Sequence, residues 1–99
     1  RLVDLVSAEI DVTNAVPTET DPAIELQQRE RSATLESALR ALSPRDRLLL
    51  TLRFEDELSA REIAQVTGMA TPFHVYRRLN HVLEALRATL RRHGLEPTE

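Results

Sequence analysis

The side chains best suited to chemistry in this sequence are cationic and imidazole groups near its C-terminal end. Residues 71–93 contain five arginines and three histidines but a single acid, Glu84. Guanidinium groups gathered in this way bind phosphates and guanine edges, so the pattern favours contact with nucleic acid. A solvated basic helix face explains the same charges equally well. The arginines are Arg77, Arg78, Arg87, Arg91 and Arg92.

Other kinds of chemistry lack the residues they need. The chain has no cysteine, which excludes disulfides, thiol catalysis and cysteine zinc sites. His74, His81 and His93 do not have the i, i+4 spacing that places two imidazoles on one helical turn. Glycine-rich phosphate loops, glycine-flanked nucleophilic serines and paired carboxylates are not found either. We therefore expect no enzyme, no metal site, no cofactor and no small-molecule substrate.

Length and composition predict one small helical domain. The 99 residues suit a single core, and 41% hydrophobic with 29% charged residues is typical of a globular protein. Aromatic residues make up only 3% and glycines number 2, which leaves few strand formers and turn residues for a sandwich or barrel. No apolar run approaches the roughly 18 residues of a membrane span. We expect a helical, cytoplasmic protein without membrane contact.

Charge is distributed unevenly along the chain. The formal net charge of −3 does not by itself favour a nucleic-acid partner. However, residues 1–58 carry seven arginines against twelve acids, whereas residues 59–99 carry six arginines against four acids. The second part is therefore the one suited to an anionic partner.

The first 22 residues are predicted to form an arm and an acidic linker. Residues 11–22 (DVTNAVPTETDP) combine proline, threonine and acids without helical periodicity. Residues 1–10 predict a short amphipathic helix from their apolar positions, which are Leu2, Leu5, Val6 and Ile10. Because the chain begins with Arg rather than Met, we expect a further segment upstream.

Capping residues predict where the next helices begin. Asp21 as N-cap with Pro22 at the first position opens a helix that runs to about Leu42. Ser43 and Pro44 open a second helix in the same way. The buried stripe expected of this second helix is Leu48, Leu49 and Leu52.

A short helix followed by a long one is predicted in the second part of the chain. Ser59 and Glu62 form a capping box for the short helix, and Gly68 supplies the left-handed residue that ends it. Thr71 and Pro72 then begin the long helix, which closes at His93 and Gly94. Its expected buried face consists of Val75, Leu79, Val82, Leu83, Leu86 and Leu90.

A short and a long helix joined by a tight turn are typical of a helix-turn-helix. Ala64 supports this arrangement, because a larger side chain facing the next helix would separate the two. We predict an all-α fold with a compact four-helix domain over residues 23–93 that ends in a helix-turn-helix. A short helix or arm and the acidic linker precede it over residues 1–22, and a tail follows over residues 94–99.

The sequence resembles region 4 of bacterial sigma factors, particularly the extracytoplasmic-function group, over about residues 23–93. The resemblance implies a four-helix domain whose last helix reads the minus-35 element of double-stranded promoter DNA. It also implies docking on the flap of the core RNA polymerase beta subunit, with an anti-sigma factor as a further candidate partner. Residues 1–10 would be the end of a promoter-melting domain. The matching segments are 39–47 (LRALSPRDR), 52–59 (LRFEDELS), 62–64 (EIA), 68–69 (GM) and the apolar face from Val75 to Leu90.

The turn departs from the family pattern. The family places an apolar anchor six residues after the turn glycine, which here is His74, whereas the apolar face starts at Val75. Ala70 and Pro72 also stand near positions where the family uses Ser or Thr. The sequence therefore predicts a turn that is one residue longer.

Residues opposite the apolar face are the candidates for contact in the major groove. At 100° per residue, the outward face of the first two turns holds Phe73, His74, Arg77, Asn80 and His81. Arg77 suits the O6 and N7 atoms of guanine, and Asn80 suits adenine. Phe73 suits a thymine methyl group.

A second set of candidates suits the DNA backbone. Arg61, Thr71 and Arg78, with the positive N-terminus of the long helix, are placed for phosphates. Such contacts set register and salt dependence rather than sequence preference. Tyr76 flanks the apolar face and is expected in the core.

Two other functions fit the same sequence. A LuxR-type transcriptional regulator output domain shares the LSPRDR and EIA motifs and the glycine six residues after the glutamate. A helical protein-interaction domain that has lost DNA reading would explain the unusual turn.

Overall fold

The computed structural model describes residues 1–10 and 22–94, and these residues contain helices but no strand. The predicted all-α fold is therefore confirmed. The predicted N-cap Asp21 and residues 11–21 of the acidic linker lie outside the described residues, as do residues 95–99. The elements are α1 (Leu2–Ile10), α2 (Pro22–Ala41), α3 (Pro44–Leu50), the π-helical turn η1 (Thr51–Glu55), α4 (Ala60–Thr67) and α5 (Pro72–Arg92).

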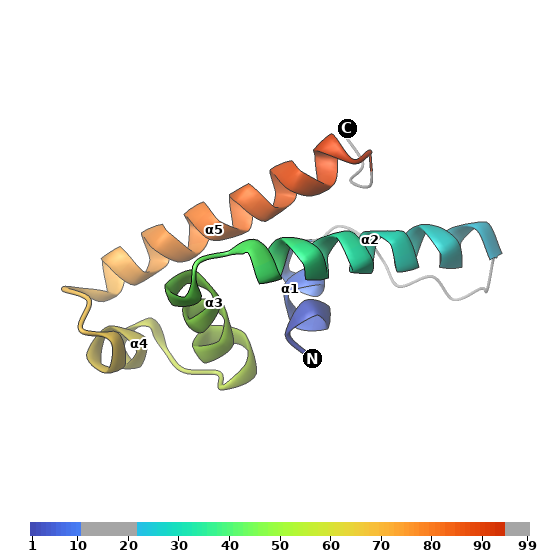
Figure 1. Ribbon diagram of the computed structural model, residues 1–99. Coiled ribbons are helices and arrows are strands. Elements are labelled where there is room, and N and C mark those ends of the chain that lie inside the picture. Colours follow the sequence, from blue (N-terminus) through green and yellow to red (C-terminus); the bar gives the residue numbers. More distant parts are fainter. Residues whose placement is uncertain (11–21, 95–99) are drawn as a thin grey trace.

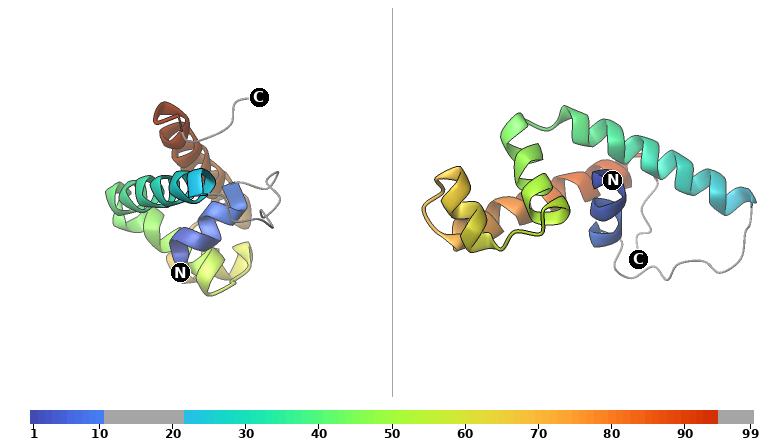
Figure 2. Two further views of the ribbon diagram at one scale, coloured as in Figure 1. Left: turned by 90° about the vertical axis from the view of Figure 1, so that its right-hand side faces the viewer. Right: turned by 90° about the horizontal axis from the view of Figure 1, so that it is seen from below.

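The two long helices α2 and α5 set the shape of the domain. In Figure 1 α5 lies above α2, α3 and η1 lie below these two helices, and α4 lies beneath the first turns of α5. α1 packs on α2, η1 and α5. Seen from below, α4 and the start of α5 form one end of an elongated molecule, whereas the first half of α2 extends at the other end (Figure 2, right). The principal extents are 46 × 25 × 24 Å.

The apolar stripes of the helices meet in one core. Every residue of the stripe predicted for α5 is at most 6% exposed. Burying a leucine contributes about 1.5 to 3 kcal/mol, so this stripe fixes how α5 is rotated about its axis. Leu48 was expected in the core but is 47% exposed. α3 turns Asp46, Leu49 and Leu50 inward at i, i+3 and i+4, which leaves Leu48 on the opposite side.

The helix starts use the capping residues that the sequence indicated. The Ser43 hydroxyl accepts a hydrogen bond from the Asp46 amide at 3.2 Å. Ser59 and Glu62 form the predicted capping box: the Ser59 hydroxyl accepts from the Glu62 amide at 3.1 Å, and the Ser59 amide donates to Glu62 Oε1 at 2.8 Å. These bonds satisfy amides that have no partner inside the helix.

The predicted amphipathic helix at the start of the chain is confirmed as α1, with a shifted face. Val3, Val6 and Ile10 are at most 5% exposed, whereas Leu5 is 40% exposed. Arg1 Nη2 also donates to Glu36 Oε2 of α2 at 3.0 Å. α1 thus contributes to the same core as α2 and α5. The domain boundaries at residues 22 and 93 stay predictions.

A wide helical turn and a strained residue connect α3 to α4. In η1 the Asp56 amide donates to the Thr51 carbonyl at 3.0 Å, which is the i→i−5 bond of a π-helix. Arg53 Nη1 then donates to the Leu58 carbonyl at 3.1 Å. Between them Glu57 has a φ of 58°, the left-handed region that favours glycine.

We expect Glu57→Gly to stabilise the protein by about 0.5 to 1 kcal/mol. A left-handed conformation costs an L-residue about 1 to 2 kcal/mol. Glycine avoids this cost, but its greater entropy in the unfolded state destabilises the fold by about 0.5 to 1 kcal/mol. Urea denaturation measures the difference. The matched control Glu55→Gly, inside the helical turn, should lose about 1 kcal/mol, and a destabilised Glu57→Gly variant would contradict the argument.

Candidate nucleic-acid interface

A tight turn separates α4 from α5. Gly68 ends α4 with a φ of 77°, and its amide donates to the Ala64 carbonyl at 2.9 Å. Ala64 is 7% exposed and belongs to the core, and its helix α4 packs on α5. Residues 68–71 form the connection, and Thr71 caps α5 by accepting from the His74 amide at 3.3 Å. The predicted turn glycine and the predicted cap are both confirmed.

The rotation of α5 agrees with the sequence-based expectation. Val75 is fully buried, whereas His74 is exposed, so the apolar face does start at Val75. All five residues predicted to face outward are exposed: Phe73, His74, Arg77, Asn80 and His81. Arg61 on α4 and Thr71 at the cap are exposed as well. Contact of these residues with DNA stays a prediction.

Four residues at the start of α5 contact one another. Thr71 Oγ1 lies 2.8 Å from His74 Nδ1. The His74 and Phe73 rings meet edge to face, with centroids 6.2 Å apart at 73°. The Arg77 guanidinium carbon lies 5.7 Å from the centroid of the Phe73 ring. These contacts connect four side chains at the cap and the first two turns of α5.

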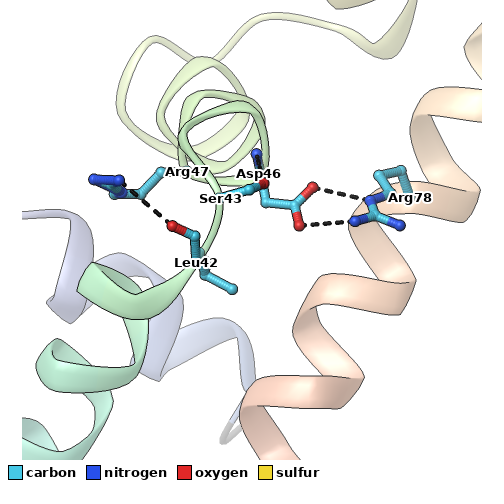
Figure 3. A network of polar contacts seen from close by, with 5 residues as sticks. All are labelled: Leu42, Ser43, Asp46, Arg47 and Arg78. Atoms are coloured by element: carbon cyan, nitrogen blue, oxygen red, sulfur yellow. Dashed lines mark hydrogen bonds and ion pairs between the residues drawn. The ribbon is translucent and has the colours of Figure 1, made fainter.

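Arg78 is held by a carboxylate from α3. Its Nε donates to Asp46 Oδ1 and its Nη2 to Asp46 Oδ2, each at 2.9 Å (Figure 3). The Asp46 side chain is 10% exposed and that of Arg78 is 46% exposed. The hydrogen bonds from Arg78 lower the pKa of Asp46 against the opposing effect of burial, and the same bonds raise the pKa of Arg78.

This ion pair was not found from the sequence. Asp46 was visible only as an acid in the first turn of a helix, three residues after its cap. Arg78 was predicted to bind phosphate, and its position at the edge of the outward face brings it within reach of α3. Because about half of its side chain is exposed, a phosphate contact by Arg78 stays a prediction.

The expectation for Tyr76 was wrong, because its side chain is 49% exposed rather than part of the core. Tyr76 lies one residue beyond Val75, so it is turned about 100° away from that residue, to the border of the apolar face. The guanidinium of Arg53 from η1 lies 6.0 Å from the ring centroid and covers part of it. The aromatic ring thus borders the candidate interface.

An open groove lies between α2 and the last turns of α5, away from the α4 end. Its volume is about 570 Å³, and most of its lining is small or apolar. Ala33, Ser37 and Ala41 recur every four residues on α2, a signal that could have indicated this face in the sequence. The other lining residues are Thr34, Ala38, Leu42, Ala85, Leu86, Thr89, Arg92 and His93.

Residues 1–10 and 22–94 hold no group of three or more histidines and acids that could bind a metal ion. Within the same part of the chain, no helix combines the length and hydropathy that crossing a membrane requires.

A short helix, a tight turn and a long helix with exposed basic and aromatic residues at its start are the features expected of a DNA-binding helical domain. Residues 32–72 match the family model described as Sigma-70, region 4. This match confirms the resemblance to sigma factor region 4 that the sequence indicated, and it supports a DNA-binding domain of the sigma-factor type. No match was found among curated proteins or solved structures.

Two features of the family match bear on function. The family consists of DNA-binding regulatory domains rather than enzymes, and its members interact with DNA and RNA polymerase. The match ends at Pro72, the first residue of α5. The elements α3, η1 and α4 therefore lie within the family match. Inferences about α5 depend instead on the exposed residues of that helix.

We expect Asp46→Ala to lower the free energy of unfolding by about 1 to 2 kcal/mol at pH 7. The variant loses a bidentate, charge-assisted hydrogen bond, and the exposure of Arg78 keeps the loss moderate. A double-mutant cycle with Arg78→Ala, followed by urea denaturation, measures the coupling. Additive losses would show that the pair contributes nothing.

This coupling should depend on pH in a defined direction. Because the pKa of Asp46 is lowered in the fold, its stabilising contribution is complete above its ordinary pKa of 3.8. The contribution is lost as the pH falls through the lower, folded value. The same cycle should therefore give equal coupling at pH 7 and pH 5 and a smaller coupling below pH 3.8. A coupling that fell between pH 7 and pH 5 would contradict this assignment.

Proposed function

We propose that this domain recognises promoter DNA for a bacterial RNA polymerase by placing α5 in the major groove at the minus-35 element. The observation that carries the proposal is the orientation of α5. Its apolar stripe is buried, while Phe73, Arg77 and Asn80 are exposed at the end of the helix that follows the turn. A helix in this position after a short helix and a turn is the recognition helix of a helix-turn-helix.

The exposed residues divide into two kinds of contact. Arg77 forks onto guanine and Asn80 pairs with adenine, each contact contributing about 1 to 3 kcal/mol of discrimination. Phe73, His74 and His81 line the same face. Arg61 and Thr71, with the N-terminus of α5, bind phosphates on either side of the groove. Such a set gives both sequence preference and a strong dependence on salt.

We further propose that the groove between α2 and α5 docks on core RNA polymerase, through the flap of its beta subunit. The groove is open, lined by small side chains and bordered by Arg92 and His93. It lies along the last turns of α5, so polymerase and DNA would occupy different parts of the helix. An anti-sigma factor that covered the groove would compete with polymerase. A protein with this promoter-recognition function would act in the bacterial cytoplasm.

The groove also supports a second candidate function, a helical protein-interaction domain without DNA reading. Under that alternative the partner binds between α2 and α5, and the residues of α5 that face outward are only solvated. A LuxR-type output domain predicts duplex binding too, but the family match at residues 32–72 favours the sigma factor.

We expect Arg77→Ala to weaken duplex binding and to relax sequence preference at one base pair. The 99-residue chain first selects duplexes from a randomised pool, and the affinity for a selected duplex is then measured at two salt concentrations. A guanine contact predicts a loss of about 1 to 3 kcal/mol that is concentrated on one base pair. The control Arg91→Ala removes the same charge about 20 Å farther along the helix and should leave the preference unchanged. If the wild-type chain selects no duplex, the DNA-binding proposal fails and the protein-interaction domain is the remaining candidate function.

We expect Ser37→Arg to reduce binding to bacterial core RNA polymerase at least tenfold without changing duplex affinity. Ser37 is exposed and lines the groove, so an arginine would fill the groove without entering the core. Co-sedimentation with core polymerase measures the loss. Gln27→Arg, on the exposed first half of α2, introduces the same side chain outside the groove. Equal losses for both variants would remove the groove as the docking surface.

A further inference from the structure

The first turn of α5 exposes an aromatic ring that contributes nothing to the core. Phe73 is 64% exposed, although phenylalanine is among the residues most often buried. Its ring instead contacts two other residues of the outward face, His74 and Arg77. We propose that Phe73 is a positioning residue that holds the Arg77 guanidinium in the orientation that reads a base pair. This inference rests on the proposed binding of DNA by α5.

The geometry of the pair allows the arginine to stack and to read at the same time. Phe73 and Arg77 are four residues apart, so their side chains lie one above the other on the same face of α5. The guanidinium carbon lies 5.7 Å from the ring centroid, within the range of a cation–π contact. Stacking uses the flat face of the guanidinium, whereas its N–H donors lie in the plane. The donors therefore remain free to fork onto a guanine edge.

The Phe73 ring also contacts His74. The Thr71 hydroxyl accepts a hydrogen bond from the His74 amide, so its proton can be donated to His74 Nδ1, 2.8 Å away. The imidazole fixed in this way meets the Phe73 ring at 73°, the edge-to-face arrangement that aromatic pairs favour. Contacts thus run from the helix cap at Thr71 through His74 and Phe73 to Arg77.

Holding the side chain before binding has a clear benefit. A free arginine loses much rotamer entropy when it is ordered against a base, and a side chain that is already restricted loses less. Arg78 shows the contrast on the next residue, because a carboxylate from α3 holds it. A ring can orient Arg77 without neutralising it, which leaves the full positive charge for the duplex.

A direct contact between Phe73 and a thymine methyl group is the competing explanation, and a double-mutant cycle separates the two. Affinities of wild type, Phe73→Leu, Arg77→Ala and the double variant are measured for a duplex selected from the randomised pool and for its single base-pair variants. Positioning predicts that Phe73→Leu weakens binding about two- to fivefold and reduces the preference at the base pair that Arg77 reads. In the Arg77→Ala background, Phe73→Leu should change neither quantity. Phe73→Tyr keeps the ring face and should restore both.

A measurement on the free chain tests the same proposal without DNA. Nitrogen relaxation of the Arg77 Nε–H group should report greater side-chain mobility in Phe73→Leu than in wild type, and no change in Phe73→Tyr. Thermal unfolding midpoints of these variants should match, because the ring is exposed.

The outcomes distinguish this inference from the function on which it rests. A loss that persists unchanged in the Arg77→Ala background, or that falls on a thymine position, would overturn positioning in favour of direct contact. Equal Arg77 mobility in Phe73→Leu and wild type would also overturn it. If the wild-type chain selects a duplex but Phe73→Leu changes neither affinity nor base preference, only this inference fails. If no duplex is selected, the proposed DNA-binding function fails as well.

Discussion

The burial of one apolar stripe on α5 determines the rest of the interface. Six residues between Val75 and Leu90 are nearly inaccessible to solvent, and they pack against α2, α3 and α4. Turning the helix by one residue would rotate it by about 100° and bring several of these leucines into water. The stripe therefore fixes which side chains face outward. Arg77, Asn80 and His81 face outward because their neighbours at other angles must face inward.

Local interactions between neighbouring elements hold α5 at its angle to the body. Gly68 allows the chain to reverse after α4, and small Ala64 allows the two helices to approach. The Asp46–Arg78 ion pair then joins the edge of the outward face of α5 to α3. The interface is thus supported by backbone conformation, by packing and by one charge pair. None of these uses the residues proposed to read bases.

The helices were largely predictable because their boundaries depend on local chemistry. Serine, threonine and proline at helix starts and glycine at helix ends act over three or four residues, which a sequence displays directly. The outward set on α5 followed from periodicity alone. The Asp46–Arg78 pair could not be predicted in this way, because it joins residues 32 positions apart. Tyr76 was misplaced because it borders the apolar face of α5, where the neighbouring elements decide burial, and Leu48 was misplaced because α3 turns Asp46 inward instead.

Arg77 and Arg78 are adjacent and chemically identical, yet the origins of their partners differ. The ring beside Arg77 belongs to α5 itself, whereas the carboxylate that binds Arg78 comes from α3. If α5 were grafted onto another helical domain, Arg77 would keep its contact with Phe73, whereas Arg78 would lose its contact with Asp46. The contact that orients Arg77 is therefore contained within α5, whereas the contact that orients Arg78, one residue later, depends on α3.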